Sequence, residues 1–176
     1  MGIKGGCEAL VHAAHRFICN MDKNRALLKL DFTNAFNSIR RDSLLEAVAL
    51  HRPDILHLAV SAYGSPSILW TGDTSLSSAE GVQQGDPLGP LLFCLALDSS
   101  LKSLDVEFLA GYLDDVSIGD TVPRLISQVR ALVAATAAIG LQLNRAKCEI
   151  VGLDPSQREI WEASSLDFVV FGGDDP

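Results

Sequence analysis

The segment FLAGYLDDVSI (residues 108–118) places two adjacent aspartates between two apolar stretches. Residues 108–113 and 116–118 predict two antiparallel strands joined by a two-residue turn made of Asp114 and Asp115. Asn-Gly or Asp-Gly is the usual sequence of such a turn, whereas two neighbouring carboxylates repel each other. A divalent cation such as magnesium, which binds carboxylates together with substrate phosphates, would compensate this repulsion.

A third aspartate has a similar setting. Residues 26–31 predict a short apolar strand that ends on Asp31. A strand end and a neighbouring hairpin tip can bring three carboxylates to one edge of a sheet. Taken alone, these residues are also explained by a solvated acidic turn and an unrelated strand-end aspartate, so the choice depends on the surrounding segments.

The rest of the chain predicts helices that alternate irregularly with strands, many of them paired as hairpins. This pattern is typical of an α+β fold with an antiparallel sheet packed on helices. Helices are expected over residues 5–19, 42–51, 54–62, 88–101, 123–139 and around Trp161, and further strands over 67–71, 76–79, 141–143, 148–153 and 168–171.

Composition narrows the class of protein. A chain of 176 residues with 48% hydrophobic and 20% charged residues fits one globular domain. Its net charge of −8 counts against a protein that binds nucleic acid over its whole surface, although residues 20–52 carry a local excess of two positive charges. The sequence has neither an export signal nor a stretch that could span a bilayer, so we expect an intracellular protein of the nucleus or cytoplasm, without a membrane partner.

The four cysteines (Cys7, Cys19, Cys94 and Cys148) have no metal-binding spacing. Each lies in an apolar periodic stretch, which predicts buried free thiols rather than a zinc site.

Four segments resemble the palm motifs of reverse transcriptases and occur in the order of that family. A match to any one of these motifs would be weak evidence for the family. The segment 81–90 is more specific, and the four motifs together are strong evidence. The helix predicted at the N-terminus begins with GGCEA (5–9), which resembles the stretch that precedes motif A in retroelements without long terminal repeats. The motif segments are LDFTNAFNSI (30–39, motif A), GVQQGDPLGP (81–90, motif B), YLDD (112–115, motif C) and GLQLN (140–144) followed by Lys147 (motif D).

The resemblance implies an RNA-directed DNA polymerase palm with partial fingers and no thumb. Residues 1–153 would form this palm, and residues 154–176 an acidic tail with a remnant of the primer grip. The implied partners are an RNA template, a DNA primer and deoxynucleoside triphosphates.

The resemblance also implies a two-metal site for magnesium, with manganese as an alternative. Asp31, Asp114 and Asp115 and the backbone carbonyl of Phe32 would be ligands, and Lys147 would protonate the leaving pyrophosphate. The implied substrate-binding residues are Phe32, Thr33, Asn34, Ala35, Phe36, Gln84 and Gly85. Phe36 would exclude a ribose 2′-hydroxyl, Gln84 would contact the incoming nucleotide, and Gly85 would let the backbone approach the template base.

Simpler interpretations remain for several of these residues. Phe36 would serve equally as a core side chain, residues 81–90 as an ordinary loop before a helix, and Lys147 as a surface lysine. Asp86 replaces the serine that is commoner in motif B, and its extra negative charge near the template counts against full activity. The whole chain is open to two rival functions, namely a decayed palm that binds only metal or a partner, and a metal-dependent phosphohydrolase.

Overall fold

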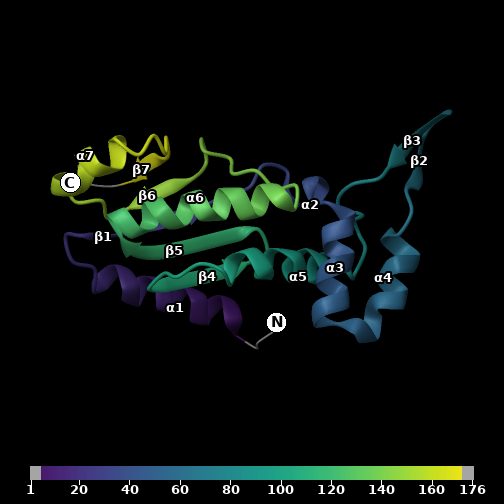
Figure 1. Ribbon diagram of the computed structural model, residues 1–176, viewed down its shortest axis with the longest axis horizontal. Helices are drawn as coiled ribbons and strands as arrows, with labels where there is room; N and C mark the ends of the chain where they lie inside the picture. Colours follow the sequence, from purple (N-terminus) through teal and green to yellow (C-terminus); the bar gives the residue numbers. More distant parts are fainter. Residues whose placement is uncertain (1–4, 172–176) are drawn as a thin grey trace. The chain divides into compact units, whose positions relative to one another are not determined.

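A five-stranded sheet organises the first of two units in the computed structural model, which describes residues 5–171 (Figure 1). Of these residues, the first unit comprises 5–32, 104–131 and 143–171, and the second comprises 33–103 and 132–142. The predicted α+β class, with a sheet packed on helices, is confirmed. Gly172, the last residue of the suggested primer-grip remnant, lies outside the described residues.

The sheet has β1 at its centre. Strand β1 (Arg25–Leu30) pairs antiparallel with β5 (Asp115–Thr121) on one side and with β6 (Glu149–Val151) on the other. Strand β4 (Phe108–Tyr112) pairs antiparallel with β5 and completes that side of the sheet. The last strand, β7 (Val169–Phe171), is parallel to β6, because η2 (Pro155–Gln157) and α7 (Arg158–Glu162) form a crossover between them. The antiparallel prediction therefore holds for four of the five strands.

Strand alternation gives the sheet one buried face that is apolar except for Asp120 near the end of β5. Ala26, Leu28 and Leu30 of β1 are completely buried, as are Val116 and Ile118 of β5. Helix α6 (Val122–Ala138) starts in this unit and runs alongside β5 in Figure 1. Its side chains at 125 and 129 are also fully buried, so the apolar stripe predicted for this helix does face a core.

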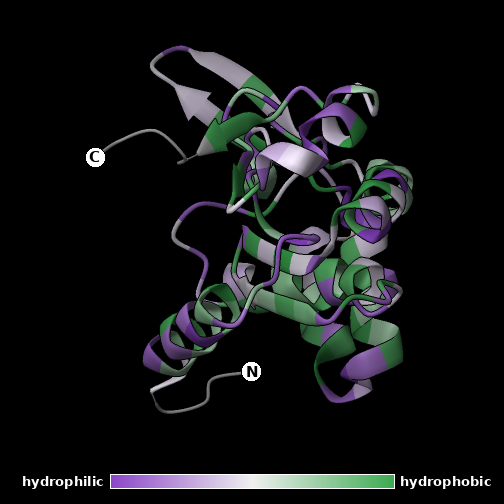
Figure 2. Ribbon diagram, turned by 90° about the vertical axis from the view of Figure 1, so that its left-hand side faces the viewer, coloured by the Kyte–Doolittle hydropathy of each residue, from purple (hydrophilic) through white to green (hydrophobic). Residues whose placement is uncertain are grey.

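The opposite face of the sheet is partly covered by α1 (Gly6–Cys19), whose green and purple stripes near the N label in Figure 2 mark it as amphipathic. The ring of Phe17 stacks on that of Phe108 in β4, with centroids 5.2 Å apart. A Cβ atom on Gly119 of β5 would lie 2.4 Å from the Phe17 ring, so glycine allows the helix to approach the sheet closely. Cys7 and Cys19 of α1 are exposed, so the prediction of buried thiols is wrong for them.

The second unit is mainly helical. It contains α2 (Ala35–Ser38), α3 (Arg41–His51), η1 (Pro53–Ile55), α4 (Leu56–Tyr63), the β2–β3 hairpin (Ser67–Thr71 and Thr74–Ser78), α5 (Gly89–Leu101) and the last turns of α6. Helix α3 packs against α5, and Leu44, Val48, Leu92 and Phe93 of these two helices are completely buried. The short helix α2 was not predicted.

Two predicted strands are shorter than expected. Residues 141–143 contribute only an isolated bridge between Leu143 and Phe32, and β6 covers three residues rather than residues 148–153. In the described part of the chain, no helix has both the length and the apolar character needed to cross a membrane.

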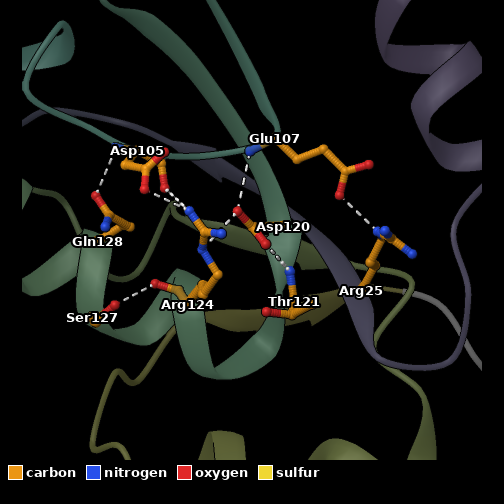
Figure 3. A network of polar contacts seen from close by, with 8 residues as sticks. All are labelled: Arg25, Asp105, Glu107, Asp120, Thr121, Arg124, Ser127 and Gln128. Carbon is orange, nitrogen blue, oxygen red and sulfur yellow. Dashed lines mark hydrogen bonds and ion pairs between the residues drawn. The ribbon is translucent and has the colours of Figure 1, made fainter.

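A network of charged groups joins β4, β5 and α6 around a buried carboxylate, that of Asp120 (Figure 3). Asp120 accepts hydrogen bonds from the backbone N–H groups of Glu107 (3.1 Å) and Thr121 (2.6 Å), and its carboxylate lies 3.3 Å from Arg124 Nε. Arg124 also pairs with the exposed Asp105 at 2.9 Å. Because only 3% of Asp120 is exposed, these partners replace water around its charge.

The substitution Asp120→Ala is expected to destabilise the chain by about 2 kcal/mol, because it leaves two backbone N–H groups and Arg124 without their buried acceptor. Thermal unfolding should then show a midpoint about 5 °C lower. Glu107→Ala is the matched control: it removes a half-exposed ion pair with Arg25 and should have a much smaller effect. Equal losses in the two variants would contradict this account of the network.

Candidate active site

The hairpin between β4 and β5 carries two of the three predicted catalytic aspartates. Tyr112 pairs with Asp115, so the two turn residues are Leu113 and Asp114. The turn therefore lies one residue earlier than the sequence predicted, and Asp115 is the first residue of β5. Leu113 has a φ of 57°, whereas Asp114 is not among the described residues with positive φ. This is the φ pattern of a type II′ turn, which normally has glycine in the first of its two central positions.

A leucine in this conformation stores backbone strain. Left-handed φ values cost a non-glycine residue roughly 1–2 kcal/mol, because the Cβ atom approaches the carbonyl oxygen. Such strained positions cluster at functional sites, where the surrounding structure holds them in place. The strain at Leu113 lies directly next to Asp114, so it supports a functional role for this hairpin.

Asp31 follows the last residue of β1, the strand next to β5. Leu30 pairs with Val116, and one further step along the ladder places Asp31 beside Asp115. By strand alternation both aspartates belong to the face that carries Lys29, which is the face opposite the buried apolar one. The register thus brings Asp31 and Asp115 to adjacent strand positions, with Asp114 in the turn that follows Tyr112.

The backbone of Asp31 is held by the motif D segment. Its N–H donates to the sulfur of Cys148 (3.4 Å), and its carbonyl accepts from the N–H of Asn144 (2.9 Å). Cys148 is completely buried, and this burial raises the pKa of its thiol, so the sulfur remains uncharged beside Asp31. Phe32, whose carbonyl was a predicted ligand, is buried and bridges to Leu143.

The chemistry of the three side chains suits a hard divalent cation, because all their donor atoms are carboxylate oxygens. Within residues 5–171, however, no three Asp, Glu, His or Cys side chains lie close enough together to hold a metal ion by themselves. Magnesium usually binds through one or two carboxylates and completes its shell with water and substrate phosphates. The arrangement therefore fits an ion that arrives with its substrate better than a permanent protein cage.

Lys147 lies in the turn before β6, and its N–H donates to the carbonyl of Asn144 at 2.9 Å. Its side chain is exposed. The same turn contacts Asp31 through Asn144, so Lys147 belongs to the segment that the fold places at the end of β1. Its role as a proton donor stays a prediction.

The remaining predicted site residues belong to the second unit, where motif A and motif B run side by side. The N–H groups of Gly81 and Val82 donate to the carbonyls of Ile39 and Phe36, each at 2.8 Å. Gly81 has a φ of 68°, and a Cβ atom there would lie 2.6 Å from the backbone of Asn37, so only glycine fits this contact.

The motif A residues after Phe32 form the start of this unit. Thr33 donates its N–H to Gln142 O (2.8 Å), and Asn34 takes a left-handed conformation with φ 48° before the short helix α2. Ala35 is buried, whereas Phe36 is half-buried with its ring stacked on Phe93 at a centroid distance of 4.4 Å. Phe36 thus has a packing role and still presents part of its surface outside the core.

Gln84 and Gly85 are exposed, whereas their neighbours Gln83 and Asp86 are held by hydrogen bonds. Asp86 accepts hydrogen bonds from the Tyr63 hydroxyl and from the N–H of Leu88 at the start of α5. Its carboxylate is therefore hydrogen-bonded inside the unit, and the effect of its charge on activity stays a prediction. Sequence reasoning missed both Tyr63 and the buried Arg41, because their partners in motif B lie 20 or more residues away along the chain.

Comparison with known proteins identifies the family. A family model described as "Reverse transcriptase (RNA-dependent DNA polymerase)" matches residues 2–168. The chain belongs to this family. Reverse transcriptases use a nucleic-acid template and a primer, and they generally require divalent metal ions.

The relatives of this reverse transcriptase segment are proteins of retrotransposons without long terminal repeats. It is 32% identical over 141 residues to the retrotransposable element SLACS 132 kDa protein of Trypanosoma brucei gambiense, covering 73% of this chain and 12% of that protein. It is 32% identical over 146 residues to the Pol polyprotein from the type-1 retrotransposable element R2 of Bradysia coprophila, covering 74% and 17%. The chain therefore spans less than a fifth of the length of these relatives.

Solved structures support the fold. Apo telomerase from Candida tropicalis, truncated from its C-terminal domain, matches with a TM-score of 0.60 and 12% identity, over 80% of this chain and 33% of that one. The same enzyme in complex with a TWJ fragment of telomeric RNA gives a TM-score of 0.58, also at 12% identity, over 83% and 29%. At this identity the likeness establishes the polymerase palm fold alone.

The turn at Leu113 can be tested by a single substitution. Leu113→Val is expected to destabilise the chain by about 1 kcal/mol, because a β-branched side chain fits a positive φ worse than leucine does. The same change at Leu109, four residues earlier in β4, should be nearly neutral, because β-branched residues favour strands. Thermal unfolding of both variants decides the matter, and equal effects at the two positions would contradict a strained turn.

Proposed function

We propose that this chain is the catalytic palm of an RNA-directed DNA polymerase that adds deoxynucleotides to a primer on an RNA template. The observation that carries the proposal is the β1–β5 register, which sets Asp31 beside Asp115 and next to the strained turn at Asp114. Membership of the reverse transcriptase family supports a catalytic role for these three carboxylates.

Asp31, Asp114 and Asp115, with the carbonyl of Phe32, would hold two magnesium ions, which manganese could replace. When bound, such ions lower the pKa of an attacking hydroxyl and neutralise charge on the triphosphate. The protein's own part is to fix the carboxylates: hydrogen bonds from the Cys148 and Asn144 segment hold the backbone of Asp31, and the hairpin holds Asp114 and Asp115. Lys147 would supply a proton to the leaving pyrophosphate.

Substrate selection falls to residues of the second unit. We assign Thr33, Asn34, Ala35, Phe36, Gln84 and Gly85 to binding of the incoming deoxynucleotide and the template base. The half-buried ring of Phe36, braced by Phe93, is rigid enough to act against a 2′-hydroxyl.

We also propose domain bounds and a cellular location for this chain. Residues 1–153 would form the palm with partial fingers, and residues 154–176 an acidic tail. Copying of a retroelement RNA would take place inside the cell, in the nucleus or cytoplasm.

Primer extension on an RNA template with deoxynucleotides and magnesium or manganese tests the reaction. Asp114→Ala should lower the rate by about 10²–10³-fold, the loss expected when one group that stabilises transition-state charge is removed. Asp73→Ala is the matched control, because Asp73 is an exposed aspartate in the turn of the other hairpin and should change nothing. Extension that survives Asp114→Ala would contradict the assignment, and no extension by the unaltered chain would favour a decayed palm.

Nucleotide selection offers a second test. Phe36→Val should raise the efficiency with ribonucleotides relative to deoxynucleotides by about 10–100-fold, since it removes one contact that discriminates between them. Phe17→Val controls for loss of a stacked, half-buried ring in the other unit. If the preference for deoxynucleotides is unchanged in Phe36→Val, the ring is a packing residue only. A phosphohydrolase built from the same carboxylates would show no such preference to lose.

A further inference from the structure

The exposed residues Gln84 and Gly85 lie between Gln83 and Asp86. The hydroxyl of one buried residue, Tyr63, forms hydrogen bonds with both of these neighbours. The hydroxyl of Tyr63 accepts a hydrogen bond from the N–H of Gln83 at 3.2 Å and donates one to the carboxylate of Asp86. The side-chain amide of Gln83 adds a bond to Ser67 Oγ at 2.9 Å. The two ends of segment 83–86 are therefore joined through the Tyr63 oxygen, in addition to the turn hydrogen bond from the N–H of Asp86 to the carbonyl of Gln83 at 3.2 Å.

Tyr63 is itself rigidly held. It is the last residue of α4, and only 2% of it is exposed. The guanidinium of Arg41 lies 5.4 Å from the centre of its ring. Arg41 also donates to the carbonyls of Gly81 (3.0 Å) and Ser78 (2.8 Å), which fixes the chain that leads into the segment.

The chemistry of the Tyr63 hydroxyl suits hydrogen bonds that persist over the whole pH range of an assay. Burial, and then the hydrogen bond to Asp86, raises the pKa of Tyr63 to about 12. At any pH at which a polymerase would be assayed, the hydroxyl therefore keeps the proton that it donates to Asp86 and the lone pairs that accept from Gln83.

Apart from the Tyr63 hydroxyl, only the turn hydrogen bond between Asp86 N–H and Gln83 O links the two ends of the segment among the described contacts. Gly85 has a φ of 84°, and nothing lies within 4 Å of the position a Cβ atom would take, so the surroundings do not restrain this residue sterically. Gln84 makes its predicted contact only if the backbone on both sides of it holds one conformation, because ordering it on each binding event would cost conformational entropy.

We propose that Tyr63 is a positioning residue, whose hydroxyl joins Gln83 to Asp86 and thereby presents Gln84 and Gly85 in one preorganised conformation to the incoming nucleotide. The role at the nucleotide rests on the polymerase function proposed above. The hold on the segment does not, and it can be measured separately.

The pairing with Tyr63 also explains the aspartate at position 86. One carboxylate oxygen of Asp86 accepts from the N–H of Leu88 (2.9 Å), and the other accepts from Tyr63. A serine there has one shorter-reaching oxygen, which cannot occupy both positions. Asp86→Asn keeps two polar atoms in place, since its amide can donate to the Tyr63 oxygen, whereas Asp86→Ala loses both contacts.

Hydrogen–deuterium exchange of the whole chain tests the hold without any assay of activity. In Tyr63→Phe, the amides of Gln83 and Asp86, which are the hydrogen-bonded amides described in the segment, should exchange at least 10-fold faster, while those of α3 and α5 remain unchanged. Thr136→Val is the matched control, because it removes another buried hydroxyl of this unit whose partner, Leu132 O at 2.8 Å, lies in its own helix. Asp86→Ala should reproduce the effect of Tyr63→Phe, and Asp86→Asn should largely avoid it. Unchanged exchange in Tyr63→Phe would overturn the proposal.

Steady-state kinetics tests the consequence for the nucleotide. Tyr63→Phe should raise the KM for deoxynucleotides about 5–20-fold and leave kcat within about 3-fold, because the binding conformation is then populated only part of the time. Adding Gln84→Ala to Tyr63→Phe should cost much less than Gln84→Ala costs alone, since the two residues would act through one contact.

Additive effects of the two substitutions would mean that Tyr63 merely stabilises the unit, and would overturn the positioning role. If the unaltered chain extends no primer, the polymerase proposal fails. In that case the exchange measurement alone supports or overturns the hold of Tyr63 on the segment.

Discussion

The antiparallel pairing of β1 with β5 is the constraint on which the first unit depends. Its register sets Leu30 against Val116 and thereby places Asp31 beside Asp115. A slip of one residue would move every side chain of β1 to the opposite face, burying Lys29 and Asp31 and exposing Leu28 and Leu30. The buried apolar residues of β1 and β5 therefore protect the register of the aspartates as well as the stability of the sheet.

The two ends of β5 differ in what they contribute. One end carries a candidate catalytic aspartate, and the other contributes to stability. Its first residue, Asp115, follows the strained turn at Leu113, and this strain disfavours the folded state. Near its other end, Asp120 is also an aspartate in a strand, but there two backbone donors and Arg124 surround the carboxylate. One end of the strand thus supplies buried hydrogen bonds that help offset the strain tolerated at the other end.

The sequence predicted the elements and the acidic strand ends well, because both depend on local patterns of apolar and charged residues. Asp31, Asp114 and Asp115 each border an apolar strand, so their positions were predicted from the local pattern, whereas their catalytic role was proposed only from the surrounding family motifs. The turn was misplaced by one residue because propensity does not favour leucine at positive φ, and only the pairing of Tyr112 with Asp115 decides it. Helix α2 was missed since it has only four residues and starts after a left-handed Asn34.

The roles of contacts distant in sequence were not predictable. Asp86 was interpreted as a free charge because its partner, Tyr63, lies 23 residues earlier, and nothing local to either residue indicates the pair. Lys147 and Gln84 were proposed from the family pattern, and the structure leaves both side chains exposed.

Many of the lysines and arginines of the chain form contacts within the chain itself. Six of its fourteen lysines and arginines (Arg25, Lys29, Arg40, Arg52, Lys102 and Arg124) form ion pairs with acidic side chains in the described part of the chain, and Arg41 is buried among backbone carbonyls. The other seven lysines and arginines belong to neither set, but the net charge of −8 opposes binding of nucleic acid by this chain alone. A palm of this kind needs to orient the reacting groups, and the network around Gln84 and the β1–β5 register are both built for orientation rather than for attraction.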